Sequence, residues 1–399
     1  MDFQSYWLLA LPMFFGLGWL AARVDIRHLL TESRALPASY FKGLNFLLNE
    51  QPDKAIEALI EVARADQQTV ELHFALGSLF RRRGEVDRAT RMHQNLVERS
   101  DLGSSQRMAA LHELAQDYLK AGLLDRAEAL FQDLRKTEFS ESALRYLLEI
   151  YVTEKDWQKA IETAEALEVA TGDSYRREVA NFYCERAAME YSHSHLEEAR
   201  AQITAALEAN RKCVRANVML GNWAQREGQH EEAMVIWKRI EGQAPEYLFL
   251  IAAPLIESAR TLGRITEALT LLRGWQQRYP ALDLLGVVFQ ATLEEEGAES
   301  ALRLVREELY RNPSLGALDK FLDAQLATAT PDQRADVQLM RDLVHAHSSR
   351  LSLFQCGSCG FKARTFHWHC PACGGWDTYP PRRNAEGELS QASSGRSVM

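Results

Sequence analysis

The sequence repeats itself about every 34 residues, and this period limits the possible folds more than any other feature. After turns rich in Gly, Asp, Lys and Glu, an alanine recurs at spacings of 34, 38, 33, 39, 34, 35 and 33 residues. These alanines are Ala55, Ala89, Ala127, Ala160, Ala199, Ala233, Ala268 and Ala301. The period is typical of the tetratricopeptide repeat, a helix pair that buries its apolar face only by stacking on its neighbours. We therefore predict an all-α solenoid of about eight to nine repeats over residues 36–349.

Glycines and prolines mark the helices of these repeats. Three glycines stand twelve residues before a repeat alanine, namely Gly43, Gly77 and Gly221. We expect the two helices of one repeat to cross closely there. Three prolines stand twelve residues after a repeat alanine, namely Pro245, Pro280 and Pro313. Proline cannot continue a helix, so we expect the second helix to end before each of them, and residues 315–349 to form a terminal helix pair.

The sequence of the amino end predicts a membrane anchor. Tyr6 to Ala22 is an uncharged run of 17 residues with aromatic side chains near both edges. As a helix this run would span about 26 Å at about 1.5 Å per residue, the short end of what crosses a bilayer. A cleaved signal peptide is the main rival, although the chain begins Met-Asp rather than with a basic residue. We expect residues 1–22 to be an uncleaved transmembrane anchor and residues 23–35 a juxtamembrane linker.

The charges beside this run predict its orientation. Arg23, Arg27, Arg34 and Lys42 follow the apolar run, and no Lys or Arg precedes it. The positive-inside rule then places the body on the cytoplasmic side of an inner membrane and the N-terminus in the periplasm. Six cysteines without a disulfide-like pattern also favour a reducing compartment.

Four cysteines near the carboxyl end carry the strongest chemical signal. Cys356, Cys359, Cys370 and Cys373 follow the pattern C-x2-C-x10-C-x2-C. Two tight turns with this spacing surround one metal ion tetrahedrally, as in a zinc ribbon. We predict a metal-binding module over residues 350–380 and a disordered, polar tail over residues 381–399. Sulfur ligands alone leave zinc and iron both open.

The segment between the two cysteine pairs is rich in aromatic residues and histidines. Its alternation suits a hairpin strand over residues 361–369. His367 and His369 are reserve ligands in principle, which four thiolates make unnecessary. Phe366, Trp368 and Trp376 exceed what so small a module buries by itself, so we expect them to dock onto the last repeats.

The remainder of the sequence argues against catalysis and nucleic-acid binding. No phosphate-binding loop, metalloprotease motif or nucleophile elbow is present. A net charge of −9 is unfavourable for a general nucleic-acid binder. We interpret Arg81–Arg83 as a solvated helix end, with an acidic-partner contact as the alternative. Cys184 and Cys213 are interpreted as small core residues, and His193 and His195 as solvated.

The combination of these parts resembles the lipopolysaccharide assembly protein B family of Gram-negative bacteria. The resemblance covers essentially the whole chain and rests on YWLLALPMFFGLGW, the repeat array, and FQCGSCGF with WHCPACGGW. It implies that the four cysteines form a rubredoxin-type site, hence one that holds iron. The ten-residue spacer is far shorter than in rubredoxins, which keeps zinc as the alternative.

The resemblance also implies a function, that of a non-enzymatic regulator of lipopolysaccharide synthesis. Family members promote destruction of the lipid A deacetylase by a membrane-anchored AAA+ metalloprotease. They are also linked to an inner-membrane lipopolysaccharide sensor and to assembly and transport proteins. A scaffold without a proteolytic role, an electron carrier and a nucleic-acid-binding ribbon are the alternatives, and the sequence is compatible with a homo-oligomer.

Overall fold

The computed structural model describes residues 51–65, 70–279, 284–348 and 354–380, and the isolated positions Phe15, Trp19, Lys42, Asn45, Phe46 and Asn49. The expected anchor, juxtamembrane linker and polar tail lie outside these residues, apart from Phe15 and Trp19. Within the described ranges, no helix combines the length and the apolar character needed to cross a membrane. The anchor therefore remains a prediction from the sequence.

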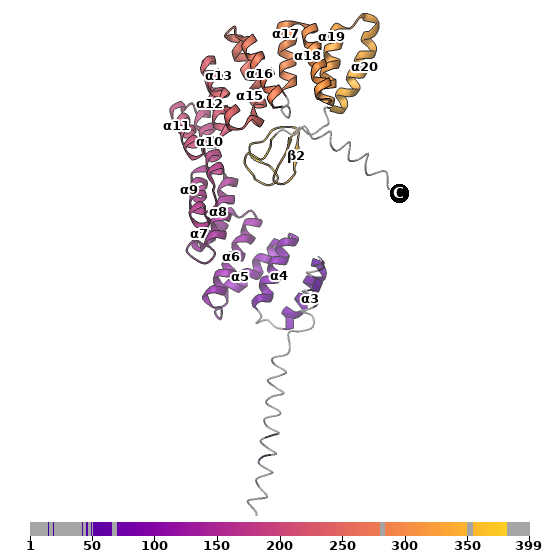
Figure 1. Cartoon of the computed structure of the whole chain (residues 1–399). Coiled ribbons are helices and arrows are strands. Elements are labelled where there is room, and N and C mark those ends of the chain that lie inside the picture. Colours follow the sequence, from indigo (N-terminus) through magenta and orange to yellow (C-terminus); the bar gives the residue numbers. More distant parts are fainter. Residues whose placement is uncertain are drawn as a thin grey trace, which may run out of the picture. The chain divides into compact units, whose positions relative to one another are not determined.

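Helices dominate the described chain, which divides into two compact units, residues 1–154 and 155–399 (Figure 1). The first unit contains α3 (Pro52–Ala65), α4 (Val70–Arg83), α5 (Val86–Glu98), α6 (Ser104–Lys120), α7 (Leu124–Leu134) and α8 (Ser140–Glu154). The second begins with α9 (Trp157–Thr171), α10 (Arg176–Ser192), α11 (Leu196–Ala209), α12 (Val214–Arg226), α13 (His230–Lys238), α14 (Ile240–Gln243) and the short 3₁₀ helix η1 (Pro245–Tyr247). It continues with α15 (Phe249–Thr261), α16 (Ile265–Arg278), α17 (Leu285–Glu296), α18 (Ala298–Arg311), α19 (Leu315–Thr328) and α20 (Pro331–Ser348). Within each unit, helices that follow one another in the chain pack together, so the predicted all-α solenoid is confirmed.

The repeat alanines lie at equivalent places in this stack. Each is the fourth residue of the second helix of its repeat, and each is fully buried. A methyl group at this position lets neighbouring helices approach closely, whereas a larger side chain would force a close-packed interior apart. The period of the sequence is therefore the period at which the helices pack.

Two of the three marked glycines lie where helices cross. A β-carbon on Gly77 would overlap the His93 imidazole of α5, and one on Gly221 would overlap the Trp237 indole of α13. In both cases the ring belongs to the second helix of the same repeat, as predicted. Gly43 lies outside the described residues.

The helix ends agree with the proline pattern. Helices α14, α16 and α18 end two residues before Pro245, Pro280 and Pro313, because the residue before a proline disfavours the helical backbone. The expected terminal pair is present as α19 and α20.

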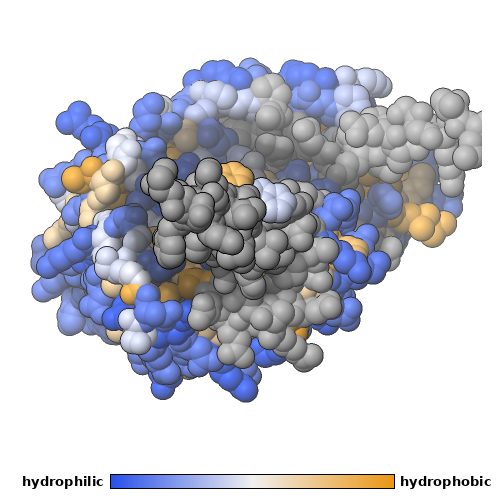
Figure 2. Space-filling model, turned by 90° about the horizontal axis from the view of Figure 1, so that it is seen from below, coloured by the Kyte–Doolittle hydropathy of each residue, from blue (hydrophilic) through white to orange (hydrophobic). Residues whose placement is uncertain are grey.

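Between the helices the core is apolar, with Trp237 and Trp275 fully buried. On the face seen in Figure 2, hydrophilic side chains predominate and hydrophobic ones are scattered.

A small module with little regular structure follows α20. Strand β1 (Phe354–Gln355) pairs antiparallel with β2 (Lys362–Ala363), and His369 forms an isolated bridge with Trp376. The strand expected over residues 361–369 was too long. After Gln355 the chain turns into the first cysteine pair, so β2 has no partner beyond two residues.

Candidate metal centre

Two tight turns of the same design carry the four cysteines. The Gly360 amide donates to the carbonyl of Cys356 at 3.0 Å, and the Gly374 amide donates to that of Cys370 at 2.9 Å. Both glycines have positive φ angles, 77° and 69°, a region that residues with a β-carbon avoid. Glycine thus closes each turn just after its second cysteine.

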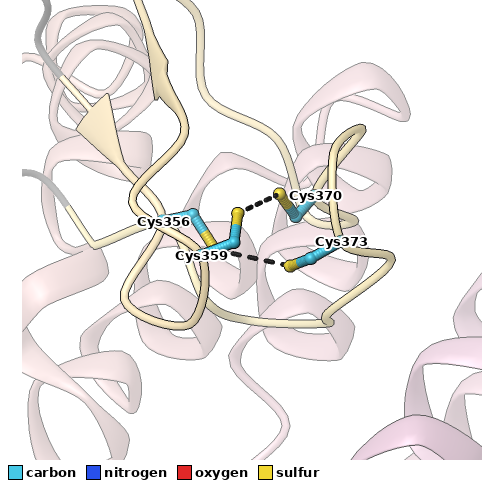
Figure 3. A group of neighbouring side chains, drawn as sticks. All are labelled: Cys356, Cys359, Cys370 and Cys373. Carbon is cyan, nitrogen blue, oxygen red and sulfur yellow. Dashed lines mark hydrogen bonds between the residues drawn. The ribbon is translucent and has the colours of Figure 1, made fainter. Parts of the chain in front are cut away.

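The four sulfur atoms converge between these turns (Figure 3). The Sγ atoms of Cys356 and Cys373 are 3.7 Å apart, and those of Cys359 and Cys370 are 3.8 Å apart. All four atoms lie within 4.8 Å of one another, and none belongs to a disulfide. A tetrahedral ion with metal–sulfur bonds of about 2.3 Å needs sulfur–sulfur edges of about 3.8 Å. The donor atoms and their spacing therefore fit one four-coordinate metal ion.

Hydrogen bonds and mutual repulsion set the charge of these sulfurs. Burial by itself would raise the pKa of Cys356, but hydrogen bonds with Thr378 and with amides of its own turn lower that pKa to about 6. The Gly375 amide favours the Cys373 thiolate, but partial desolvation and the neighbouring cysteines outweigh it and raise the pKa of Cys373 to about 12. Four thiols in contact resist ionising together, because their negative charges repel. A bound cation removes that penalty and holds all four as thiolates.

The two histidines of this segment lie outside the sulfur cluster. The ring of His369 stacks on Trp376 with centroids 4.4 Å apart, and His367 Nε2 lies 3.2 Å from the Thr365 hydroxyl. Among the described residues, the group whose atoms converge as metal ligands consists of the four cysteines. Zinc and iron both accept this donor set.

Comparison with known families matches both parts of the fold. Residues 354–381 match the family described as the rubredoxin metal binding domain. Residues 42–90, 112–175 and 189–246 match the tetratricopeptide repeat. These matches agree with a repeat solenoid that ends in a four-cysteine module.

Two relatives match almost the whole chain. The chain is 33% identical over 382 residues to lipopolysaccharide assembly protein B of Escherichia coli strain K12, covering 95% of this chain and 98% of that protein. The protein of the same name from Haemophilus influenzae is 31% identical over 391 residues, with the same coverage. The chain belongs to the lipopolysaccharide assembly protein B family. Among solved structures, the crystal structure of MamA covers 44% of this chain and 91% of that chain at 19% identity, with a TM-score of 0.33, which is too low to carry an argument.

In this lipopolysaccharide assembly protein B family member, Trp376 of the metal-binding module packs against the repeats. Its side chain is only 3% exposed. It meets Trp157 of α9 and Phe182 of α10 edge to face, with ring centroids 6.3 and 5.8 Å apart. Edge-to-face aromatic pairs of this kind stabilise beyond the area they bury. The expectation that module aromatics dock onto repeats therefore agrees with these contacts.

A second aromatic group joins the module to η1 and α15. Trp368 stacks on Tyr247 with centroids 5.6 Å apart, and Phe366 meets the same ring edge to face at 5.9 Å. Phe249 contacts both Phe354 and Phe366, at 5.5 and 5.7 Å. The contacting repeats are nevertheless not the last ones, because they belong to α9, α10, η1 and α15 and not to α17–α20.

Polar contacts at the same interface were not foreseen from the sequence. The Asp377 carboxylate accepts from the Asn181 side-chain amide at 2.9 Å, and Tyr247 donates its hydroxyl to the Asp377 carbonyl at 3.1 Å. Burial raises the pKa of Asp377, although the Asn181 hydrogen bond opposes this effect. Arg215 lies over the rings of Trp368 and Trp376. Asn181 and Asp377 are 196 residues apart, so no local pattern links them.

Cys184 and Cys213 are buried in the repeats, as expected for small core residues. Their Sγ atoms are 3.8 Å apart, a contact between α10 and the residue before α12 that the sequence did not indicate.

The interpretation of Arg81–Arg83 as a solvated helix end is wrong for Arg81. Arg81 is not solvated: it pairs with Glu113 at 2.6 Å and with the fully buried Asp117 at 2.7 Å. Asp117 also pairs with the buried His93 at 2.5 Å. Arg81 thus binds two acidic residues of α6 that are 32 and 36 residues away in the sequence. A run of like charges does not predict such long-range ion pairs.

Proposed function

We propose that this chain is a non-enzymatic adaptor that acts in lipopolysaccharide biosynthesis at the inner membrane. In this proposal it promotes degradation of the lipid A deacetylase by the membrane-anchored AAA+ metalloprotease. Membership of the lipopolysaccharide assembly protein B family supports the general role, and repeat solenoids offer extended surfaces for binding proteins. An inner-membrane lipopolysaccharide sensor and assembly and transport proteins are the further partners we propose.

The observation that carries the proposal is the docking of the metal module onto the repeats. Trp376 and Asp377 of the module contact α9, α10 and η1, so these helices and the four-cysteine turns form one binding body. We propose Cys356, Cys359, Cys370 and Cys373 as ligands of one structural metal ion, iron or zinc. Such an ion ties the two turns together and contributes on the order of 10 kcal/mol to folding so small a module.

The amino-terminal run Tyr6–Ala22 supplies the membrane part of the proposal. We propose that it anchors the chain once, with its N-terminus in the periplasm and its body on the cytoplasmic side. Confinement beside a membrane protease raises the effective concentration of any captured substrate without a new contact. The same run is available as a contact for a membrane-embedded regulator.

The experiment that tests the adaptor measures the lifetime of the lipid A deacetylase after translation is blocked. We expect the lifetime to lengthen severalfold in cells without this protein. Cys370→Ser should lengthen it equally, because the module loses its metal and its docked fold. Ser358→Ala, an exposed change in the first turn, is the matched control and should leave the lifetime unchanged.

The name of the relatives, lipopolysaccharide assembly protein B, favours one alternative, a scaffold that coordinates lipopolysaccharide synthesis and export enzymes without proteolysis. An unchanged deacetylase lifetime in cells without the protein would contradict the adaptor and support this scaffold. Retention of both metal and activity by Cys370→Ser would instead contradict the structural role of the metal.

A further inference from the structure

The terminal helix α20 exposes a cluster of large apolar side chains. Leu339, Met340 and Leu343 are 61, 48 and 65% exposed. No other helix between residues 70 and 348 of the described chain carries more than one exposed large hydrophobic residue. Single exposed residues are ordinary on protein surfaces, whereas an apolar cluster on one helix marks a place where something binds.

The opposite face of α20 already has its partners. Helix α20 packs against α19, Val337 is buried, and Arg341 donates to Asp323 of α19 at 2.9 Å. His345 lies 3.2 Å from Asp319 of the same helix. The exposed cluster is therefore not the core face of the last repeat. The outer helix of a solenoid normally presents a polar face to water, and α20 departs from this rule.

Two residues of the cluster, Met340 and Leu343, belong to a stripe along α20 whose two ends carry different side chains. Asp336, Met340, Leu343 and His347 follow one another at intervals of four, three and four residues, which places them on one side of the helix. Asp332 extends the stripe at its acidic end. The stripe thus has carboxylates at one end, apolar side chains in the middle and an imidazole at the other end.

We propose that this stripe is an interface between two copies of the chain, with their α20 helices antiparallel. A parallel pair would set Asp336 against its own copy, and like charges in contact are destabilising. An antiparallel pair centred between Arg341 and Asp342 sets Asp336 against His347 and Met340 against Leu343. It also sets the two helix dipoles antiparallel, so that the positive end of each helix lies beside the negative end of the other, which is the favourable arrangement.

The charges that flank the stripe do not oppose this pairing. Asp342 is already bound within its own helix, because Arg341 lies 3.2 Å from its carboxylate and Gln338 donates to it at 2.9 Å. The carboxylate on this flank is therefore compensated before a second copy arrives. A self-complementary stripe is what a two-fold symmetric interface requires, since each copy offers the same patch.

This inference does not depend on the proposed adaptor function. The interface lies on α20, whereas the module contacts described above lie on α9, α10, η1 and α15. Two joined copies would present every binding surface twice, which raises avidity for any partner with two sites.

The first test is sedimentation velocity of the metal-loaded full-length chain in detergent micelles. We expect a dimer, and we expect Leu343→Glu to weaken association by about tenfold or more, because it places two carboxylates in the apolar centre of the interface. Val169→Glu is the matched control. Val169 is the one exposed large hydrophobic residue of α9, 88% exposed, and its substitution should leave association unchanged. A monomeric wild-type chain would overturn the proposal.

The second test fixes the orientation and separates this interface from any contact made by the amino-terminal run. Asp336→Cys and His347→Cys variants are mixed, oxidised and mapped by mass spectrometry, so that crosslinks through native cysteines are not counted. We expect crosslinks between the two variants and few within either alone. Crosslinking of Asp336→Cys to itself would indicate a parallel pair and contradict our register. Unchanged crosslinking in a Leu343→Glu background would show that the stripe does not hold the copies together.

Discussion

Removing the Trp376 side chain should release the metal module from the repeats. Trp376 is 3% exposed and touches Trp157 and Phe182 on two different helices. Truncating a buried Trp to Ala costs about 3–5 kcal/mol. The two edge-to-face pairs account for about 1–3 kcal/mol of this. Since about 1.4 kcal/mol is a factor of ten, the undocked population should rise roughly 100- to 3,000-fold in Trp376→Ala.

Hydrogen exchange measured by mass spectrometry on the metal-loaded chain reports this release directly. We expect faster exchange in the α10 segment around Phe182 and in the module, with the metal content unchanged. Phe361→Ala is the matched control, because Phe361 is an aromatic residue of the same module that is 40% exposed. It should leave the exchange of α10 at the wild-type level.

Two results would refute this reasoning. Wild-type exchange of α10 in a metal-loaded Trp376→Ala chain would show that docking does not depend on this side chain. Loss of the metal together with the docking would show that Trp376 holds the cysteine turns themselves, and the docking free energy would then have to be sought in the contacts of Tyr247 and Phe249.

Three further changes test the packing and charges described above. Gly221→Ala should destabilise the second unit by about 1–3 kcal/mol in urea unfolding, because its methyl overlaps Trp237, whereas Gly286→Ala meets open space and should stabilise by up to about 1 kcal/mol; equal effects would contradict the close crossing. Asp117→Ala should destabilise the first unit by about 3–5 kcal/mol, because it removes the buried partner of the His93 ring and one of the two carboxylates that pair with Arg81, and a neutral effect would contradict the buried network. Burial raises the pKa of Asp377, so its protonated carboxyl stabilises docking fully below the unfolded pKa of about 3.9, and this contribution is lost as pH rises through the folded pKa. Asp377→Asn, which stays neutral at every pH, should therefore increase the stability of docking more at about pH 8 than at about pH 5. A gain independent of pH, measured by hydrogen exchange of the module, would contradict this assignment.

Much of the fold was predictable because its determinants are local and periodic. The repeat alanines recur with the helix pairs themselves, and all eight are buried at the same helical position. The cysteine turns are equally local, since Gly360 and Gly374 supply the backbone conformation that closes each turn. Sequence therefore predicted the solenoid and the four converging sulfurs. The length of the hairpin strand was missed, because a strand needs a partner and β1 offers only two residues.

The contacts that join distant segments were decided by the tertiary structure alone. Asn181 donates a hydrogen bond to Asp377, 196 residues away, and Arg81 forms ion pairs with two carboxylates on a helix of the next repeat. Period and composition carry no information about such pairs, because the free energy of a buried charge depends on which groups surround it. The sequence by itself determined that this chain stacks helices and gathers four thiols. Only the folded chain decided that the thiol module docks onto α9, α10, η1 and α15 instead of the last repeats, that Asp377 joins this interface, and that the outer face of α20 is left apolar.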